Sequence, residues 1–353
     1  MNGTSDTNAA QCPLPHRPEG ETITLAHGEG GRLTRQLIRR TILPRMRNPW
    51  LEPLGDAAIL AACPERIVVT TDAFVVSPLF FPGGDIGRLS VYGTVNDLAV
   101  AGARPQWLSL SLILEEGLAI ATLERVLDSV AAAAERTGVT IVTGDTKVVP
   151  RGAADGLFIT TTGVGVLAEP AWAGPLAIEP GDVIVVSGPI GRHGMAVLAA
   201  RHGLELEPPP SSDCAPLNEA VEGLRRRGVP VRALRDATRG GVAAVLHEWA
   251  DASGVSFELD EAAVPVTPEV RGACELLGLD PLHVANEGTM LIAVEPAGVE
   301  DCLEALREVS VTRDPAVIGR AMKRTLAPVV VRRVLGREQP LDEPLGAPLP
   351  RIC

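Results

Sequence analysis

The thiol of Cys353 is a candidate reactive group with a long reach, because a cysteine in a terminal segment moves with that segment. The residues from Gly336 to Cys353 include four prolines, which disfavour a regular helix or a central strand and favour extended backbone. At roughly 3.3 Å per residue this segment can span about 60 Å, whereas a compact chain of this length has a radius of gyration of about 20 Å. The thiol can therefore reach the interior of its own protein or the active site of a partner. The alternative is a frayed terminus that happens to end in cysteine.

Acidic residues form a second group that could do chemistry. Four aspartates of the first half lie beside glycine, asparagine or threonine: Asp56, Asp72, Asp97 and Asp145. Any one alone is more simply interpreted as a turn former or a helix cap. Together they predict hard oxygen ligands for Mg²⁺ ions that are shared with a triphosphate, and such ions would let an acidic protein hold ATP. The chain has no GxxxxGK(S/T) motif and no strand followed by GxGxxG, so a P-loop is excluded and a Rossmann dinucleotide site is unsupported.

A glycine-rich segment near the start of the chain is the third feature. Within His27 to Gly31 the glycines Gly28, Gly30 and Gly31 let main-chain N–H groups approach a ligand closely, and phosphate is the usual one. A plain turn is the alternative. A helix is expected to follow at about 33–43.

Composition limits the kind of protein. The 353 residues carry a formal net charge of −12, which argues against nucleic acid and anionic membrane surfaces as partners. The six cysteines are scattered without a CxxC pair, which makes a zinc site or a disulfide framework improbable. We find no signal segment and no apolar run of membrane-spanning length, so we expect a cytoplasmic protein with reduced thiols.

The elements that must position these groups alternate between strand and helix. We expect a strand at 66–72, a helix at 85–101 that contains Asn96 and Asp97, and strands at 139–142 and 157–166. The Pro/Gly-rich stretch 169–180 predicts a linker between two α/β domains, at 21–168 and 181–335. Residues 1–20 are expected to be disordered, and 336–353 to form a flexible tail. In the second domain, Asp236 precedes a helix opened by glycines, and Glu287 precedes a strand at 290–294.

Eight short motifs, in order from about residue 21 to the end of the chain, resemble those of the HypE family of hydrogenase maturation factors. The motifs are His27–Gly31, Gly55–Ala58, Thr71–Asp72, Val95–Ala99, Gly144–Val149, Arg235–Gly241, Asn286–Thr289 and Pro350–Cys353. Two of them, Val95–Ala99 and Arg235–Gly241, are similar to motifs of the wider superfamily of aminoimidazole ribonucleotide synthetase and selenophosphate synthetase. The terminal Pro-Arg-Ile-Cys sequence indicates HypE within it. The resemblance implies an α/β fold of the α+β type, with two aminoimidazole ribonucleotide synthetase-like domains and a mobile C-terminal tail.

The resemblance also implies a reaction. HypE-like proteins receive a carbamoyl group on the C-terminal thiol from the carbamoyltransferase HypF and use ATP to phosphorylate its oxygen. Loss of phosphate and a proton leaves a thiocyanate, which passes as cyanide to iron on a HypC–HypD complex. A homodimer through the first domain is implied as well. Two alternatives are another ATP-dependent superfamily enzyme acting on a small amide or selenide, and a non-catalytic adaptor whose tail docks a partner.

Roles for individual residues follow from the resemblance. Cys353 would carry the carbamoyl group, Glu287 would remove its amide protons, and Lys147 would neutralise charge or move a proton there. Mg²⁺ would be held by Asp56, Asp72, Asp97 and Asp145. The ATP site would comprise these four aspartates together with Gly28, Gly30, Gly31, Asn96 and Asp236. The plainer interpretations are a surface lysine for Lys147, a turn carboxylate for Glu287 and a helix N-cap for Asp236.

Overall fold

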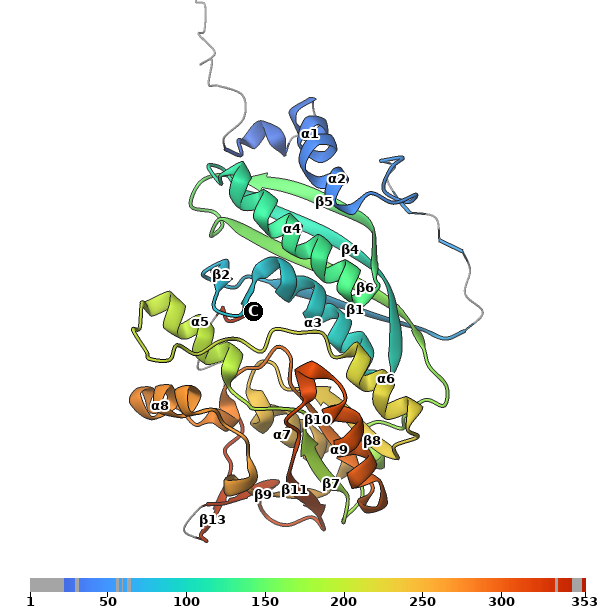
Figure 1. The fold of residues 1–353 in the computed structure, drawn as a ribbon, viewed down its shortest axis with the longest axis vertical. Coiled ribbons are helices and arrows are strands. Elements are labelled where there is room, and N and C mark those ends of the chain that lie inside the picture. Colours follow the sequence, from blue (N-terminus) through green and yellow to red (C-terminus); the bar gives the residue numbers. More distant parts are fainter. Residues whose placement is uncertain are drawn as a thin grey trace, which may run out of the picture.

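A computed structural model describes residues 22–28, 32–54, 57–58, 60–61, 65–333, 336–344 and 351–353. Its first domain is built on a four-stranded sheet of order β1-β6-β4-β5, in which only β4 and β5 run parallel. The strands are β1 (Ile67–Phe74), β4 (Ala103–Glu115), β5 (Thr140–Val149) and β6 (Leu157–Leu167). Two helices, α3 (Ile86–Val100) and α4 (Ile120–Thr137), lie across one face of this sheet (Figure 1).

Helix α3 is the central element of the molecule. Asp85 caps its N-terminus by accepting the N–H groups of Gly87 and Arg88. Most of its residues are buried, because one side packs on β1, β4 and β6 while other sides meet α4, α6 and β8. A helix that is apolar around most of its circumference must be enclosed. The expected helix at 85–101, with Asn96 and Asp97 inside it, is confirmed.

The shorter elements of the first domain lie at the ends of this layer pair. The expected single helix at 33–43 is α1 (Arg32–Leu37), a π-helical turn (Ile38–Ile42) and α2 (Leu43–Met46) in continuous succession. A 3₁₀ turn, Leu25–His27, precedes it. The small strands β2 (Phe80–Phe81) and β3 (Gly84–Asp85) form a hairpin before α3.

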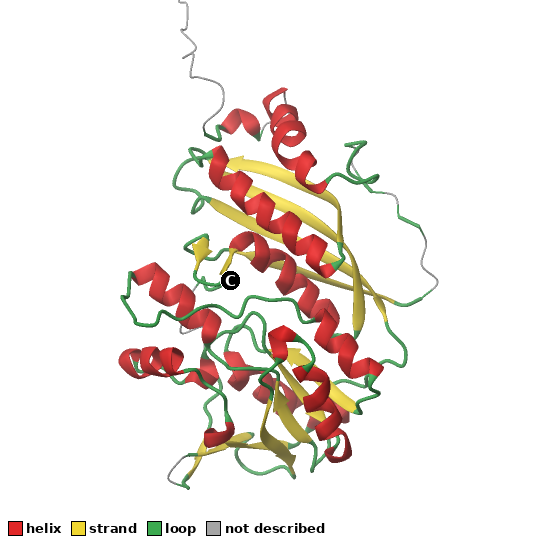
Figure 2. Ribbon diagram, viewed as in Figure 1, coloured by secondary structure: helices red, strands yellow, loops and turns green. Residues whose placement is uncertain are grey.

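The second domain is a seven-stranded mixed sheet of order β13-β12-β9-β11-β7-β10-β8 with helices on both faces (Figure 2). Its strands are β7 (Val183–Val186), β8 (Val231–Asp236), β9 (Ser256–Asp260), β10 (Met290–Val294), β11 (Ala316–Met322), β12 (Val329–Arg332) and β13 (Glu338–Pro340). The helices are α5 (Arg192–His202), α6 (Asn218–Arg226), α7 (Gly241–Ser253), α8 (Pro268–Leu277) and α9 (Val299–Arg307), with 3₁₀ turns at Pro175–Ala177, Glu261–Ala263, Pro281–His283, Pro296–Gly298 and Ser310–Thr312.

Residues of β10 show why helices are needed on both faces. Leu291 and Ala293 join a buried cluster with α7, whereas Met290 and Ile292 join another with α6 and α9. Because side chains alternate along a strand, a strand that is apolar at every position requires cover on each side. No helix among the described residues is long and apolar enough to cross a membrane.

Three sequence expectations need correction. Asp236 is the last residue of β8 and not a helix N-cap, because α7 begins only at Gly241 after a left-handed Gly240. The strands expected at 66–72 and 139–142 extend further along the chain as β1 and β5, so Asp72 and Asp145 lie inside strands. The start of the expected flexible tail is ordered, since β13 pairs with β12 and Leu341 is buried. Proline is compatible with β13 because this strand lies at the edge of the sheet.

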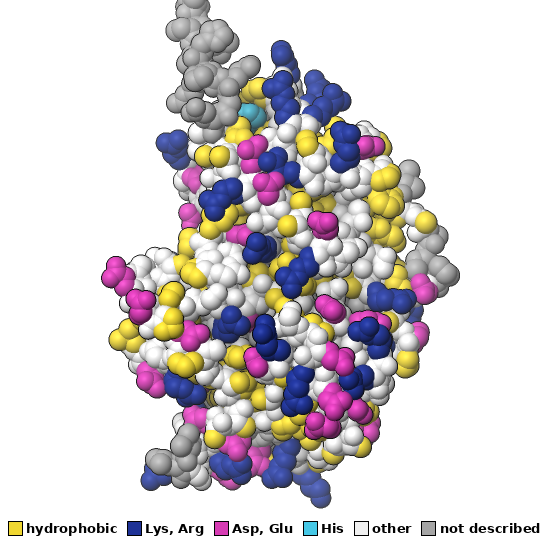
Figure 3. Space-filling model, viewed as in Figure 1, with side chains coloured by type: hydrophobic (Ala, Val, Ile, Leu, Met, Phe, Trp, Pro, Cys, Tyr) yellow, Lys and Arg dark blue, Asp and Glu magenta, His cyan; other side chains and the backbone are white. Residues whose placement is uncertain are grey.

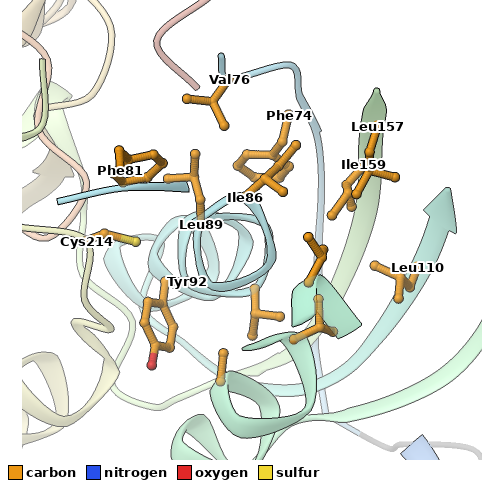
Figure 4. Close-up of a cluster of buried hydrophobic side chains, with 14 of the residues drawn as sticks. Phe74, Val76, Phe81, Ile86, Leu89, Tyr92, Leu110, Leu157, Ile159 and Cys214 are labelled. Carbon is orange, nitrogen blue, oxygen red and sulfur yellow. The ribbon is translucent and has the colours of Figure 1, made fainter. Parts of the chain in front are cut away.

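The cores of the two domains meet around α3. Phe74, Val76 and Phe81 approach Ile86 and Leu89 of this helix, and Cys214 of the second domain lies at the margin of the same cluster (Figure 4). The surface in Figure 3 has acidic and basic side chains interspersed, so the net negative charge is not gathered into one patch on that face.

Candidate active site

Four carboxylates meet between the two domains. Asp72 comes from β1, Asp97 from α3, Asp236 from the end of β8, and Glu287 from the loop before β10. Threonines of the first domain hold two of them: Thr94 Oγ1 donates to Asp72 Oδ2 at 2.9 Å, and Thr70 Oγ1 donates to Asp97 Oδ2 at 2.9 Å. The four carboxylates and Cys353 are called the interdomain site below.

Burial and repulsion between carboxylates raise the pKa values of three of these groups, Asp72, Asp236 and Glu287. Burial, followed by repulsion from Asp97, raises the pKa of Asp72 to about 6, although the hydrogen bond from Thr94 opposes the shift. Burial and repulsion from Asp97 raise the pKa of Asp236 to about 7. Such groups are costly to leave unpaired, so a cation or a proton must neutralise the site.

Glu287 has the strongest perturbation. Burial, and then repulsion from Asp236, raises its pKa well above the ordinary value. Its side chain is 3% exposed and Oε1 has no hydrogen-bond partner. The carboxyl group lies against α3, where a Cβ added at Gly93 would come within 3.9 Å of Oε2. An unpartnered buried carboxyl group beside other titratable groups is typical of a group that acts on a ligand.

The loop that carries Glu287 is fixed on both sides by hydrogen bonds. The carboxylate of Asp213 accepts the N–H groups of Glu287 and Gly288, at 3.2 and 3.0 Å, and the hydroxyl of Thr289 at 2.8 Å. Asn286 donates to the carbonyl of Ala237 at 2.7 Å. A Cβ at position 288 would lie 1.8 Å from the carbonyl oxygen of Asp213, so this close approach requires glycine. Each residue of the Asn-Glu-Gly-Thr motif therefore serves to place Glu287.

The C-terminal residues return to this site. The N–H of Val75 donates to the carbonyl of Cys353 at 3.0 Å, and Ile352 is 2% exposed within the buried cluster around α3. The side chain of Arg351 forms an ion pair with Asp155 at 2.9 Å and donates to the carbonyl of Val75 at 3.1 Å. The tail is therefore docked, with the last three residues in contact with the first domain.

The docked thiol lies close enough to the carboxylates for their negative charge to change its pKa. Burial raises the pKa of Cys353 to about 12, and repulsion from Glu287 and Asp72 adds to the shift while Arg239 opposes it. A thiol in this environment stays protonated near neutral pH, so it is a poor nucleophile while docked. The four described cysteines, Cys353 among them, are free thiols.

Asp145 and Lys147 lie elsewhere. Across the sheet, Asp72 of β1 is paired with Thr161 of β6, and Thr161 is paired with Leu110 of β4. Leu110 is in turn paired with Gly144 of β5. Asp145, the next residue of β5, is paired with Ser111 of β4. Paired residues share a face of the sheet and successive residues alternate, so Asp145 and Lys147 point to the face opposite Asp72. They form an exposed ion pair of 3.1 Å, called the outer-face pair below.

The remaining predicted residues divide into three cases. The amide of Asn96 is buried and engaged, donating to Ala215 O at 3.1 Å and accepting the N–H of Leu217 at 2.7 Å, so it holds the second domain on α3. Gly28 packs against β5, where an added Cβ would lie 2.6 Å from the N of Val148. Asp56, Gly30 and Gly31 lie outside the described residues.

Several residues of the site escaped the sequence analysis. Arg239 falls within the Arg235–Gly241 motif and could have been selected as a cation near the carboxylates. Thr70, Thr94, Asp155 and Asp213 carry no local signal, because their roles depend on segments far away in the sequence. Within the described residues, no group of three or more His, Cys, Asp or Glu side chains is arranged as a ready metal site.

Two family models match the chain. Residues 54–167 match the AIR synthase related protein, N-terminal domain, and residues 179–331 match the AIR synthase related protein, C-terminal domain. The fold and the site between its domains thus define a two-domain protein of the AIR synthase related class.

Full-length relatives narrow this class. Carbamoyl dehydratase HypE of Escherichia coli K12 is 48% identical over 337 residues, covering 94% of this chain and 99% of the relative. A crystal structure of the hydrogenase maturation protein HypE in complex with ATP is 44% identical, with a TM-score of 0.89 over 93% of this chain and 99% of that one. A HypE–HypF complex matches with a TM-score of 0.76 and 42% identity, over 89% of this chain and 100% of that one. The chain belongs to the HypE family of carbamoyl dehydratases, as its motifs predicted.

Proposed function

We propose that this chain uses ATP to dehydrate a carbamoyl group carried on Cys353 to a thiocyanate, which then supplies cyanide to the iron of a hydrogenase. The observation that carries the proposal is the position of the C-terminal thiol beside the unpartnered carboxyl group of Glu287. A relative that matches 94% of the chain bears the name carbamoyl dehydratase. A carrier thiol explains why Cys353 lies within reach of an interior site.

The chemistry balances in two steps. The carbamoyl oxygen attacks the γ-phosphorus of ATP, releasing ADP, while one N–H proton leaves to Glu287 and a C=N bond forms. The phosphorylated oxygen then departs as phosphate, which accepts the second N–H proton, and S–C≡N is left on Cys353. Amide oxygen is a poor leaving group and phosphate is a good one, so the triphosphate supplies the driving force. Glu287 suits the base in its ionised form, because the raised pKa means that this form has a strengthened proton affinity.

The electrostatics of the thiol support a two-position carrier. When docked, Cys353 has a raised pKa and is protonated, so it resists reaction with electrophiles. When extended into solvent the thiol regains an ordinary pKa of about 8.5 and can attack a carbamoyl donor. A neutral carbamoyl thioester entering the site brings no extra negative charge among the carboxylates. We therefore propose that loading takes place outside the interdomain site and dehydration inside it.

The donor set of the interdomain site fits Mg²⁺ and a nucleotide. Asp72 and Asp97 present hard oxygen atoms with threonine partners, and their mutual repulsion is what a divalent cation relieves. Mg²⁺, when bound, would neutralise charge on the transferred phosphate. Asp236 is a further candidate ligand, and Arg239 is a cation near the same carboxylates. Binding of ATP is supported by the solved ATP complex of a relative.

A second copy of the chain would explain the outer-face pair. Asp145 and Lys147 cannot join Asp72 within one chain because the sheet separates them. We propose a homodimer through the outer face of the first sheet, which exposes Ile67 and Val69 at 58% each. In such a dimer Asp145 and Lys147 of one subunit would help to hold the nucleotide of the other.

Partners follow from the same chemistry. A HypF-type carbamoyltransferase would load Cys353, in line with the solved HypE–HypF complex. A HypC–HypD iron complex would accept the cyanide, and a cytoplasmic location remains a prediction. The docked thiol favours this carrier over a free-standing synthetase acting on a small amide or selenide, and over a non-catalytic adaptor.

The decisive experiment measures the mass of the C-terminal peptide after incubation with HypF and its carbamoyl donor, before and after Mg-ATP. We expect a carbamoyl group on Cys353 first and a nitrile after ATP, with ADP and phosphate released in equal amounts. A carbamoyl group that persists after ATP, with ATP hydrolysed, would contradict the dehydration.

A further inference from the structure

His193, in the first turn of α5, contacts the docked tail from the second domain. Its Nε2 lies 2.8 Å from the carbonyl oxygen of Ile352 and its Nδ1 lies 2.8 Å from Ser212 Oγ. A carbonyl oxygen only accepts, so Nε2 carries the proton. Burial lowers the pKa of His193, which leaves Nδ1 unprotonated and able to accept the hydroxyl hydrogen of Ser212. The ring is fully buried and meets Phe81 edge to face, with centroids 5.3 Å apart.

The partner of His193 belongs to the segment that fixes Glu287. Ser212 Oγ also accepts the N–H of Cys214 at 3.0 Å. Between these two residues, Asp213 accepts the N–H of Glu287 and the hydroxyl of Thr289. One three-residue segment therefore touches the tail through His193 on one side and holds the loop of Glu287 on the other.

We propose that His193 is a positioning residue that latches the C-terminal tail beside Glu287 and connects the docked tail to the loop that places this carboxyl group. The two domains share the latch, because Val75 and Asp155 bind the tail from the first domain while His193 and Arg201 bind it from α5. His193 and Arg201 contact main-chain carbonyls, so they recognise the docked backbone. Asp155 contacts the side chain of Arg351 and recognises the sequence.

His193 is the contact whose loss should matter most. Arg351 and Asp155 are about half exposed, and an exposed ion pair contributes little. The carbonyl of Ile352 faces a fully buried imidazole, and without that donor it would be buried and unsatisfied. Loss of the donor should therefore favour the undocked tail.

The first test measures access to the thiol, without HypF or ATP. The rate at which iodoacetamide alkylates Cys353 is followed by peptide mapping, which separates it from the other cysteines. His193→Phe keeps an aromatic ring but removes the donor, and should raise the rate about tenfold. His193→Gln keeps an N–H near the position of Nε2 and should stay within about twofold of the unchanged protein.

A matched control is present in the same chain. His247 of α7 is also buried and its Nε2 donates to the carbonyl of Leu341 at 3.0 Å, upstream of the docked residues. His247→Phe should leave the alkylation of Cys353 unchanged. If His193→Phe reacts no faster than this control, the latch is overturned. If His193→Phe does not fold, His193→Leu, which also removes the donor to Ile352, takes its place, and a rate equal to that of the unchanged protein overturns the proposal in the same way.

The second test rests on the proposed function and separates positioning from folding. In single-turnover reactions of protein already carbamoylated on Cys353, His193→Phe should form thiocyanate about tenfold more slowly, with unchanged affinity for Mg-ATP. Loading by HypF should be unimpaired, and His193→Gln should restore the rate. Equal dehydration rates in His193→Phe and unchanged protein would overturn the link to Glu287. If the unchanged protein forms no thiocyanate, the proposed function fails while the alkylation test still decides the latch.

Discussion

The interdomain site and the outer-face pair both contain aspartates of the first domain, yet the protein treats them in opposite ways. Asp72 is held by Thr94, faces other carboxylates and has a raised pKa of about 6. Asp145 is exposed, lies on the other face of the sheet and is paired with Lys147 at 3.1 Å. Solvent screens the second pair, so it stores little energy. Asp72, in contrast, is destabilised in its ionised form by burial and by repulsion from Asp97, and a proton or a cation would offset this cost.

The two regions differ in whether one chain by itself supplies the neighbouring groups that a reaction would need. In the interdomain site the fold has already assembled carboxylates, a cation and a thiol from both domains and the tail. The outer-face pair has no such neighbours within the described part of the chain, and only a second subunit or a bound nucleotide would give it a function. Substitutions in the two regions should therefore differ in size and in their dependence on dimerisation.

The largest effect is expected from Cys353→Ala. This variant should fold and bind Mg-ATP normally, because it removes one sulfur atom from a docked terminus whose anchors are Ile352 and Arg351. It should accept no carbamoyl group and form no nitrile, which mass spectrometry of the C-terminal peptide measures. Full carbamoylation of another cysteine in this variant would remove Cys353 from the mechanism.

Glu287→Gln should have the next largest effect. Glutamine keeps the shape of the side chain but has no proton affinity, so formation of thiocyanate should fall about 10²- to 10⁴-fold. Loading of Cys353 and binding of ATP should remain. Rapid-quench measurement of the nitrile tests this, and a normal rate would show that another group is the base.

Asp72→Asn and Asp145→Asn sharpen the comparison. Each should weaken binding of Mg-ATP by at least about tenfold in calorimetric titration, because each removes an anionic ligand. If Asp145 acts across a dimer, mixing the two variants should restore tight binding of Mg-ATP at some of the sites. In a random mixture half of the dimers are mixed and each has one intact site, so about a quarter of the sites should recover. No recovery would exclude Asp145 from the nucleotide site of the partner subunit.

The pH dependence should distinguish the two regions as well. The pKa values of Asp72 and Asp236 are raised in the folded state, to about 6 and about 7, so the folded protein binds protons more tightly than the unfolded chain. Their contribution to stability is fully present below the unfolded value of 3.8 and is lost as the pH rises through 6 and 7. Without nucleotide, the free energy of unfolding should therefore decrease over this window. Affinity for Mg-ATP should increase over the same window, because the metal needs ionised carboxylates.

Denaturant titrations at several pH values measure the first trend, and calorimetric titrations measure the second. Asp236→Asn should flatten both profiles, and Asp145→Asn should leave their shape unchanged. If the two variants had identical pH profiles of stability and of Mg-ATP affinity, the proposed difference between the interdomain site and the outer-face pair would be wrong.

The smallest effect is expected for Lys147→Ala on stability. Its ion pair with Asp145 is exposed, so the free energy of unfolding should change by less than about 1 kcal/mol. Any larger loss should appear only in Mg-ATP binding by the dimer. Comparison of chemical denaturation with nucleotide titration separates the two.

The sequence by itself determined the family and the two-domain class, and it supplied the candidate site residues. Short motifs with fixed residue types indicated Asp72, Asp97, Glu287 and Cys353. Such motifs can be found in a sequence because their residue types meet local requirements. In Asn286–Thr289, for example, position 288 must be glycine to allow the close approach of another main-chain segment. Helix α3 and strand β10 were also predictable, since periodicity and local caps act over a few residues.

Only the tertiary structure decided which of these candidate residues lie close together. The strand registers place Asp145 on the face opposite Asp72, although both lie beside glycine or threonine in similar motifs. Asn96 proved to hold the domains together, and Asp236 to end a strand. His193, Asp155 and Asp213 became relevant because α5, the turn between β5 and β6, and the loop before α6 converge on the tail and on the loop of Glu287. The physical reason is range: capping and periodicity are local, whereas burial, pKa shifts and docking depend on segments brought together over hundreds of residues.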